Sequence, residues 1–219
     1  MTPVVAVAGA TGYTGQRLLA QMSDHPRWRS RALVREGSQH KAVFPLKQDF
    51  AICALDDVAS LTAALRGCTV VIQTIGTTRA QFKPGVSYGT VDYGTTVALL
   101  QAARNAGAKR FLLLSSTGAG RPFGAYLRWK ARTEQAVREA SLDWTIIRPA
   151  AIVGPGRRAI QAGSLPFALL AKLPLLDGVG AQLQAIDVDG LARCFINCLD
   201  DDTTIGRILE GRSLWRMVK

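Results

Sequence analysis

The chain has 219 residues, enough for one domain with a substantial hydrophobic core. Its 27 basic and 16 acidic residues give a formal net charge of +11, which favours anionic partners such as nucleotides. No stretch approaches the ~20 consecutive apolar residues of a membrane-spanning helix, and the N-terminus leads into a predicted strand without a signal-peptide pattern. We therefore expect a cytoplasmic protein with no membrane association.

The cysteines and histidines do not show the spacing of a metal site. No Cys-x-x-Cys pair occurs, and the histidines fall in or near predicted loops without ligand partners. We therefore expect no metal and a reducing environment. The residues concerned are Cys53, Cys68, Cys194, Cys198, His25 and His40.

The N-terminal segment carries the strongest motif. A β-branched run at 4–8 leads into three glycines spaced three apart, Gly9, Gly12 and Gly15, and residues 16–22 have the pattern of a helix. In a strand–turn–helix unit of this kind the glycines permit a sharp turn, close approach of a pyrophosphate and close packing of the helix on the strand. The helix N-terminus then offers N–H groups to the anion. The segment predicts a dinucleotide site.

A second strand at 31–35 ends in Arg35, twenty residues after Gly15. Sites selective for NAD place an acidic residue here, whereas an arginine meets the 2′-phosphate of NADP. A guanidinium can bind phosphate with two parallel hydrogen bonds. Arg35 therefore predicts NADP as the cofactor, although the neighbouring Glu36 leaves some tolerance for NAD open.

The remaining predicted elements alternate between strand and helix. They are a strand near 50–53, a helix at 58–65, a strand at 69–75, a helix at 86–104, a strand at 109–115, a helix at 125–140, a strand at 144–147, a helix at 187–199 and a strand at 207–210. This alternation predicts an α/β fold with one doubly wound parallel sheet. Sites in such sheets lie at the carboxyl ends of the strands, where 76–78, 115–117 and 149–154 fall.

The region after Pro149 has a different composition, because glycines and prolines divide it into short pieces. About 70 residues are too few for a second domain with its own core. We therefore expect a single domain over 1–219 with a small C-terminal substrate cap at 154–186. Apolar residues of the cap fit either a pocket wall or ordinary helix packing; they are Phe167, Leu169, Leu170 and Leu173.

Tyr126 and Lys130 stand four residues apart on one face of the helix predicted at 125–140. An ammonium beside a phenol favours the phenolate, so the pair could exchange a proton with a carbonyl oxygen. A hydroxyl is needed to fix that oxygen, and Ser115, Ser116 and Thr117 follow the preceding strand. Either Ser116 or Thr117 could face the substrate.

Two basic clusters, near 27–35 and 121–132, lack the interleaved aromatic residues of a base-stacking surface, apart from Trp28 and Trp129. Neither lies on a helix-turn-helix pattern. We interpret them as a solvated basic face with a phosphate-binding rim, which does not favour a nucleic-acid partner. The second cluster comprises Arg121, Arg128, Lys130 and Arg132.

These motifs together resemble the atypical short-chain dehydrogenases/reductases, a Rossmann family of NAD(P)-dependent proteins that includes the NmrA-like group. The matching segments are Gly9-Ala10-Thr11-Gly12-Tyr13-Thr14-Gly15, Leu112-Leu113-Leu114-Ser115-Ser116, Tyr126-x-x-x-Lys130 and Ile147-Arg148-Pro149. The segments at 75–79 and 115–119 are similar to the Tat-interacting oxidoreductase-like subgroup. The resemblance covers nearly the whole chain.

The resemblance implies an NADP site and a reductase that transfers a hydride to a small carbonyl substrate. Its catalytic residues would be Tyr126, Lys130 and Ser116 or Thr117. Its cofactor-binding residues would be Gly9, Thr11, Gly12, Tyr13, Thr14, Gly15, Arg35, Leu55, Thr74, Gly76, Ser115, Tyr126, Lys130, Pro149 and Ala151. Because some relatives keep the cofactor site without robust turnover, an NADPH-sensing regulatory protein is the alternative, followed by a nucleotide-sugar epimerase or dehydratase. A protein partner or a homodimer is left open.

Overall fold

The computed structural model describes residues 2–41, 49–156 and 182–218. Within these ranges seven strands form one sheet in the order β3-β2-β1-β4-β5-β6-β9, and every neighbouring pair is parallel. The strands are β1 (Val4–Ala8), β2 (Arg29–Val34), β3 (Asp49–Ile52), β4 (Cys68–Gln73), β5 (Arg110–Leu114), β6 (Asp143–Arg148) and β9 (Arg207–Glu210). The order reverses between β1 and β4, which confirms the doubly wound parallel sheet.

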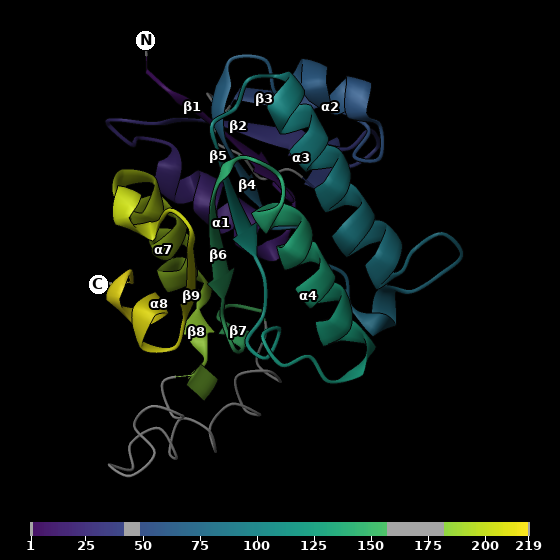
Figure 1. Ribbon diagram of the computed structural model, residues 1–219. Helices are drawn as coiled ribbons and strands as arrows, with labels where there is room; N and C mark the ends of the chain where they lie inside the picture. Colours follow the sequence, from purple (N-terminus) through teal and green to yellow (C-terminus); the bar gives the residue numbers. More distant parts are fainter. Residues whose placement is uncertain (1, 42–48, 157–181, 219) are drawn as a thin grey trace.

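Helices cover both faces of the sheet (Figure 1). They are α1 (Tyr13–Met22), α2 (Val58–Ala64), α3 (Thr95–Asn105), α4 (Gly124–Arg138), α7 (Val188–Asp200) and the short α8 (Arg212–Arg216). Side chains cap some of these helices: Asp57 accepts hydrogen bonds from the backbone N–H groups of Ala59 and Ser60 at the start of α2.

Two hydrophobic cores lie on opposite faces of the sheet, because side chains of a strand alternate between its faces. Val5 and Val7 of β1 face α1 and α7, whereas Ala6 and Ala8 face α2, α3 and α4. The five residues of β5 are all buried, as expected for a strand covered on both sides. Such burial rigidly fixes the carboxyl ends of the strands, where the site residues follow.

Two predicted helices differ in extent from the structure. The first helix begins at Tyr13 rather than at 16, because the chain enters helical geometry directly after Gly12. The helix predicted over 86–104 is found at 88–105, but its first part, η3 (Tyr88–Gly94), has π-helical geometry before α3 continues it, and Gly89 lies against the ring of Trp129 on α4. Wide helical turns of this kind are frequent at functional sites.

The ends of the predicted cap are joined by a small parallel pairing of β7 (Ile152–Val153) and β8 (Ile186–Asp187). Most of the cap, including the apolar residues predicted at 167–173, lies outside the described residues, so the cap stays a prediction. Across the described ranges, the helices are all too short or too polar to cross a bilayer.

Candidate functional site

The turn between β1 and α1 requires its glycines. Gly9 has φ +85°, and a Cβ there would lie 2.5 Å from Thr74 Oγ1. A Cβ on Gly15 would overlap the carbonyl oxygen of Gly9, and the N–H of Gly12 donates to that same oxygen at 2.8 Å. The strand, the turn and the first turn of α1 are therefore packed backbone to backbone, as a dinucleotide-binding turn requires.

The N-terminus of α1 is prepared for an anion. Its N-cap, Gly12, contributes no side-chain hydrogen bond, and the first turn contains no acidic residue. The first N–H groups of a helix carry partial positive charge and need acceptors that its own turn cannot supply. A pyrophosphate fits this end. Of the predicted contacts, Thr14 is buried beside it, and Thr11 and Tyr13 are partly buried.

Arg35 and Thr74 lie at the carboxyl edge of the sheet, on either side of β1. Arg35 follows β2 directly and is exposed. Thr74 follows β4, and its hydroxyl donates to the carbonyl oxygen of Ala8 at 2.9 Å, which ties the end of β4 to the end of β1. Leu55, after β3, is partly buried against the core on the side of α2. The edge thus collects the predicted cofactor residues in one place.

Lys130 forms a buried ion pair that the sequence did not reveal. Its Nζ lies 3.0 Å from Oδ1 of Asp92 in η3, and the side chains are 7% and 2% exposed. Oδ2 of Asp92 accepts a hydrogen bond from the backbone N–H of Thr77 at 3.0 Å. Gly76 lies over this pair: a Cβ there would still be 3.5 Å from Asp92 Oδ1 and 3.6 Å from Lys130 Nζ. Asp92 therefore joins α4 to the loop after β4, and a methyl group at Gly76 would fit against the pair without overlap.

Tyr126 lies one turn before Lys130 and is 37% exposed. The Nζ of Lys130 is 5.8 Å from the centroid of its ring, and the ring of Tyr88 is 5.3 Å away in a tilted arrangement. The predicted pair is thus brought together, with the lysine buried and the tyrosine open to solvent. Asp92 and Tyr88 come from the π-helical turn, whose local sequence alone reads as ordinary helix, so no spacing rule singled them out.

The three predicted hydroxyls after β5 have different partners. Ser115 is buried and donates to Glu134 Oε1 at 2.5 Å. Thr117 donates to the carbonyl oxygen of Arg148 at 3.1 Å. The hydroxyl of Ser116 has a long contact, 3.4 Å, to the carbonyl oxygen of Thr117. Ser116 is therefore the least committed of the three to the protein's own backbone and side chains.

A second buried ion pair lies one helical turn beyond Lys130. The carboxylate of Glu134 accepts two hydrogen bonds from Arg148, at 2.8 Å from Nε and 2.6 Å from Nη2. Nη1 of Arg148 also lies 3.0 Å from Glu210 Oε2. The hydrogen bond to Glu134 raises the pKa of Arg148 still further above its ordinary value. This network ties α4 to β5, β6 and β9, and it was not predicted.

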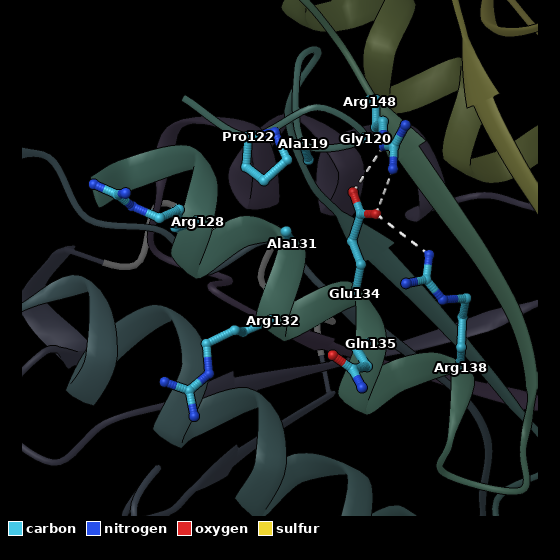
Figure 2. Close-up of a pocket in the computed structure, with 10 residues that line it drawn as sticks. All are labelled: Ala119, Gly120, Pro122, Arg128, Ala131, Arg132, Glu134, Gln135, Arg138 and Arg148. Atoms are coloured by element: carbon cyan, nitrogen blue, oxygen red, sulfur yellow. Dashed lines mark hydrogen bonds and ion pairs between the residues drawn. The ribbon is translucent and has the colours of Figure 1, made fainter. Parts of the chain in front are cut away.

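A hollow of about 480 Å³ lies between α4 and the loop after β5 (Figure 2). Figure 2 shows that Arg138 points toward Glu134, whereas the guanidinium groups of Arg128 and Arg132 extend away from it. Arg132 lies 4.9 Å from the ring of Trp129. The predicted solvated basic face is thus partly wrong: Lys130 is buried rather than solvated, because Asp92 compensates its charge.

The last predicted cofactor residues, Pro149 and Ala151, follow β6. The carbonyl oxygen of Pro149 accepts from the N–H of Thr117 at 2.9 Å, and that of Ala151 from the N–H of Ile186 at 2.8 Å. Their backbone thus joins the segment after β6 to the loop after β5 and to β8. Within 2–41, 49–156 and 182–218 there is no group of three or more His, Cys, Asp and Glu that could hold a metal ion.

The parallel sheet, the reversal of strand order beside β1 and the glycine turn define a Rossmann-type dinucleotide-binding protein. Comparison with known families agrees, since residues 9–166 match the NAD(P)H-binding family. The chain belongs to this family of NAD(P)-binding, oxidoreductase-like proteins, which confirms the resemblance drawn from its motifs.

Individual relatives differ in length and name. The chain is 36% identical to a ceramide reductase of Caulobacter vibrioides over 79% of its own length, and it spans 53% of that protein. It is 28% identical to the mitochondrial protein fmp52 of Aspergillus fumigatus, covering 96% of the chain and 93% of the relative. Among solved structures, the oxidoreductase ylbE of Lactococcus lactis superposes with a TM-score of 0.68 at 20% identity, covering 94% and 88% of the two chains. This last likeness shows the fold alone.

Proposed function

We propose that the protein is an NADP-dependent oxidoreductase that reduces the carbonyl group of a small molecule. The observation that carries the proposal is the buried Lys130, held at 3.0 Å by Asp92, beside the exposed Gly76 and one turn from Tyr126. The glycine turn, the uncapped N-terminus of α1 and the exposed Arg35 supply the cofactor contacts that such a reaction needs.

When bound, the reduced nicotinamide supplies a hydride to the carbonyl carbon. Tyr126 donates the proton that the carbonyl oxygen then takes up, so the product is an alcohol. Ser116 holds the same oxygen by a hydrogen bond, because its hydroxyl is the least committed of the three after β5. Lys130 holds the nicotinamide ribose and places a positive charge near the phenol, 5.8 Å from the ring centroid.

Cofactor choice is tested by titrating the protein with NADPH and NADH, read by energy transfer from tryptophan to the nicotinamide. Arg35→Ala is expected to weaken NADPH binding at least tenfold and to change NADH binding little, since only NADPH carries the 2′-phosphate. Arg29→Ala is the matched control, because Arg29 is also exposed but begins β2 instead of following it. An equal loss of affinity for both cofactors in Arg35→Ala, or no loss of affinity for either, would contradict the assignment of Arg35 to the 2′-phosphate.

Catalysis is tested by a screen of aldehydes and ketones with NADPH, followed by Tyr126→Phe. The variant is expected to lose about 10²- to 10⁴-fold in kcat, the usual worth of a positioned proton donor, and to keep cofactor affinity. Tyr93→Phe is the control. The ring of Tyr93, in η3, packs on Trp129, which lies on the same face of α4 as Tyr126. Full activity in Tyr126→Phe would remove Tyr126 from the chemistry.

A second candidate is a regulatory protein that binds NADPH and turns over little. It is favoured by the ion pair itself, because Asp92 balances the charge of Lys130 and thereby weakens its effect on the tyrosine. Tight NADPH binding with no turnover of any carbonyl, together with a partner captured only from the cofactor-bound protein, would support this candidate over the first.

A further inference from the structure

A chain of three aromatic rings leads away from the proposed catalytic group. The ring of Phe82 meets that of Tyr88 edge to face at 4.7 Å, and Tyr88 meets Tyr126 at 5.3 Å. The first two rings come from the segment between β4 and α3, and the third from the first turn of α4. Residues 44 positions apart in the chain thus build one continuous apolar wall.

The two ends of this aromatic wall are open to solvent. Phe82 is 41% exposed and Tyr126 37% exposed, and Phe123, just before α4, is 91% exposed. Edge-to-face packing of Phe82 and Tyr88 holds their rings in place, whereas an isolated aromatic side chain on the surface would not be held. A contiguous group of exposed rings costs free energy in water and marks a binding surface more often than scattered apolar side chains do.

The wall ends where the proposed reaction takes place. The ring of Tyr126 is shared by the two parts: Nζ of the buried Lys130 lies 5.8 Å from its centroid, and the ring of Tyr88 packs 5.3 Å from it. A molecule whose carbonyl oxygen meets the hydroxyl of Tyr126 would therefore have water or the polar pair on one side and aromatic carbon on the other. Only an apolar substituent gains by lying along the aromatic side.

We propose that the substrate is a carbonyl compound carrying a large apolar group, and that Phe82 and Tyr88 determine this specificity by packing against that group. The inference rests on the proposed reductase function and adds the substrate class. A small hydrophilic aldehyde or sugar would leave the wall uncovered and gain nothing from it.

The first test is a series of straight-chain aldehydes from propanal to octanal with NADPH. We expect kcat/KM to rise about two- to fourfold for each added methylene, the range that burial of a CH₂ allows. Phe82→Ala and Tyr88→Ala should flatten this rise, measured as the ratio of kcat/KM for octanal to that for propanal within each variant. Phe50→Ala should leave the rise intact, because Phe50 is 55% exposed on β3 at the far edge of the sheet. A comparison of kcat/KM for benzaldehyde and cyclohexanecarbaldehyde distinguishes aromatic stacking from burial of apolar surface.

A second measurement keeps the inference separable from the reductase function. Nile red, a neutral apolar dye, is titrated into the NADPH-loaded protein, and octanal is expected to displace it. Phe82→Ala should weaken dye binding at least threefold and Phe50→Ala should not. If carbonyls are reduced but chain length and Phe82→Ala have no effect, the specificity inference fails and the function stands. If no carbonyl is reduced but the dye binds at Phe82, the proposed function fails and the apolar wall stands; dye binding unchanged in Phe82→Ala overturns the wall.

Discussion

The helix α4 carries two buried ion pairs, one turn apart, that differ in how much room surrounds them. At Lys130 and Asp92 a methyl group added to Gly76 would find 3.5 Å or more to either charged atom. At Glu134 and Arg148 a methyl group added to Gly120 would fall 2.8 Å from Arg148 Nη1. A methyl group would therefore sit beside the first pair at ordinary contact distance, whereas beside the second it would collide with the guanidinium of Arg148, although Glu134 and Arg148 also line the hollow of about 480 Å³.

This difference teaches that buried charge alone does not mark a functional site. Glu134 and Arg148 satisfy each other and two further groups, Ser115 and Glu210, so their hydrogen-bonding capacity is used within the fold. Lys130 makes one ion pair, with the carboxylate of Asp92, and an ammonium has three donors, so donors are left for another molecule. The pair of Lys130 and Asp92 therefore suits binding, and the pair of Glu134 and Arg148 suits positioning of the loop after β5.

The largest effect is expected from Glu134→Ala, which leaves the guanidinium of Arg148 buried without its main partner. We expect the free energy of unfolding to fall by about 3–5 kcal/mol, measured by urea denaturation. The double variant Glu134→Leu with Arg148→Met should recover part of this loss, because no unpaired charge remains. A loss below about 1 kcal/mol in Glu134→Ala would mean that Glu210 alone can compensate Arg148.

Asp92→Asn is expected to cost somewhat less, about 2–4 kcal/mol, because the amide keeps the hydrogen bond from Thr77 while the charge on Lys130 loses its partner. Cofactor affinity, read by energy transfer from tryptophan to NADPH, should also fall. Adding Lys130→Met should restore part of the stability and none of the binding. Recovery of both in the double variant would make the pair structural, like the second one.

Two glycine substitutions test whether a methyl group fits beside one ion pair and not beside the other. Gly120→Ala should destabilise by about 1–3 kcal/mol, since the new methyl group overlaps a guanidinium held by two carboxylates. Gly76→Ala should change the free energy of unfolding by less than about 0.5 kcal/mol and weaken NADPH binding, because the methyl group would lie beside Lys130. Thermal and urea unfolding measure the first property, and cofactor titration the second. Similar destabilisation by both substitutions would remove the contrast.

The smallest effect is expected from Arg138→Ala. Its guanidinium is 3.8 Å from Glu134 Oε2 and its side chain is 41% exposed, so solvent screens the attraction. Pairs of this kind contribute about 0–0.5 kcal/mol. Urea unfolding at low and high salt should show at most a shift of that size, which disappears at high salt. A loss above 1 kcal/mol would make Arg138 part of the closed network.

Much of the fold could be predicted from the sequence, because its signals are local. Buried parallel strands such as β4 and β5 are continuous apolar runs, and the glycine turn after β1 has a fixed spacing. The π-helical geometry within the segment 86–104 could not be predicted, since its apolar pattern is that of an ordinary helix and its contact, Gly89 against Trp129, joins residues forty positions apart in the chain.

The site was predictable where a motif fixes the spacing and not where a partner comes from elsewhere. Tyr126 and Lys130 are one turn apart on any helix, so their proximity followed from the sequence. Asp92 and Glu210 reach α4 and β6 only through the tertiary fold, and neither lies in a recognisable motif. The different partners of Ser115, Ser116 and Thr117 likewise depend on where α4 and β6 place Glu134 and the carbonyl oxygen of Arg148.

The short pairing of β7 with β8 has a consequence for how the chain tolerates change. It holds Val153 beside Asp187, so the two ends of the connection of 33 residues between them are neighbours. The entropy of closing such a connection grows only with the logarithm of its length, and each doubling costs about 0.6 kcal/mol. Segments of quite different length and composition could therefore be exchanged between β7 and β8 at small cost to the sheet and its carboxyl edge.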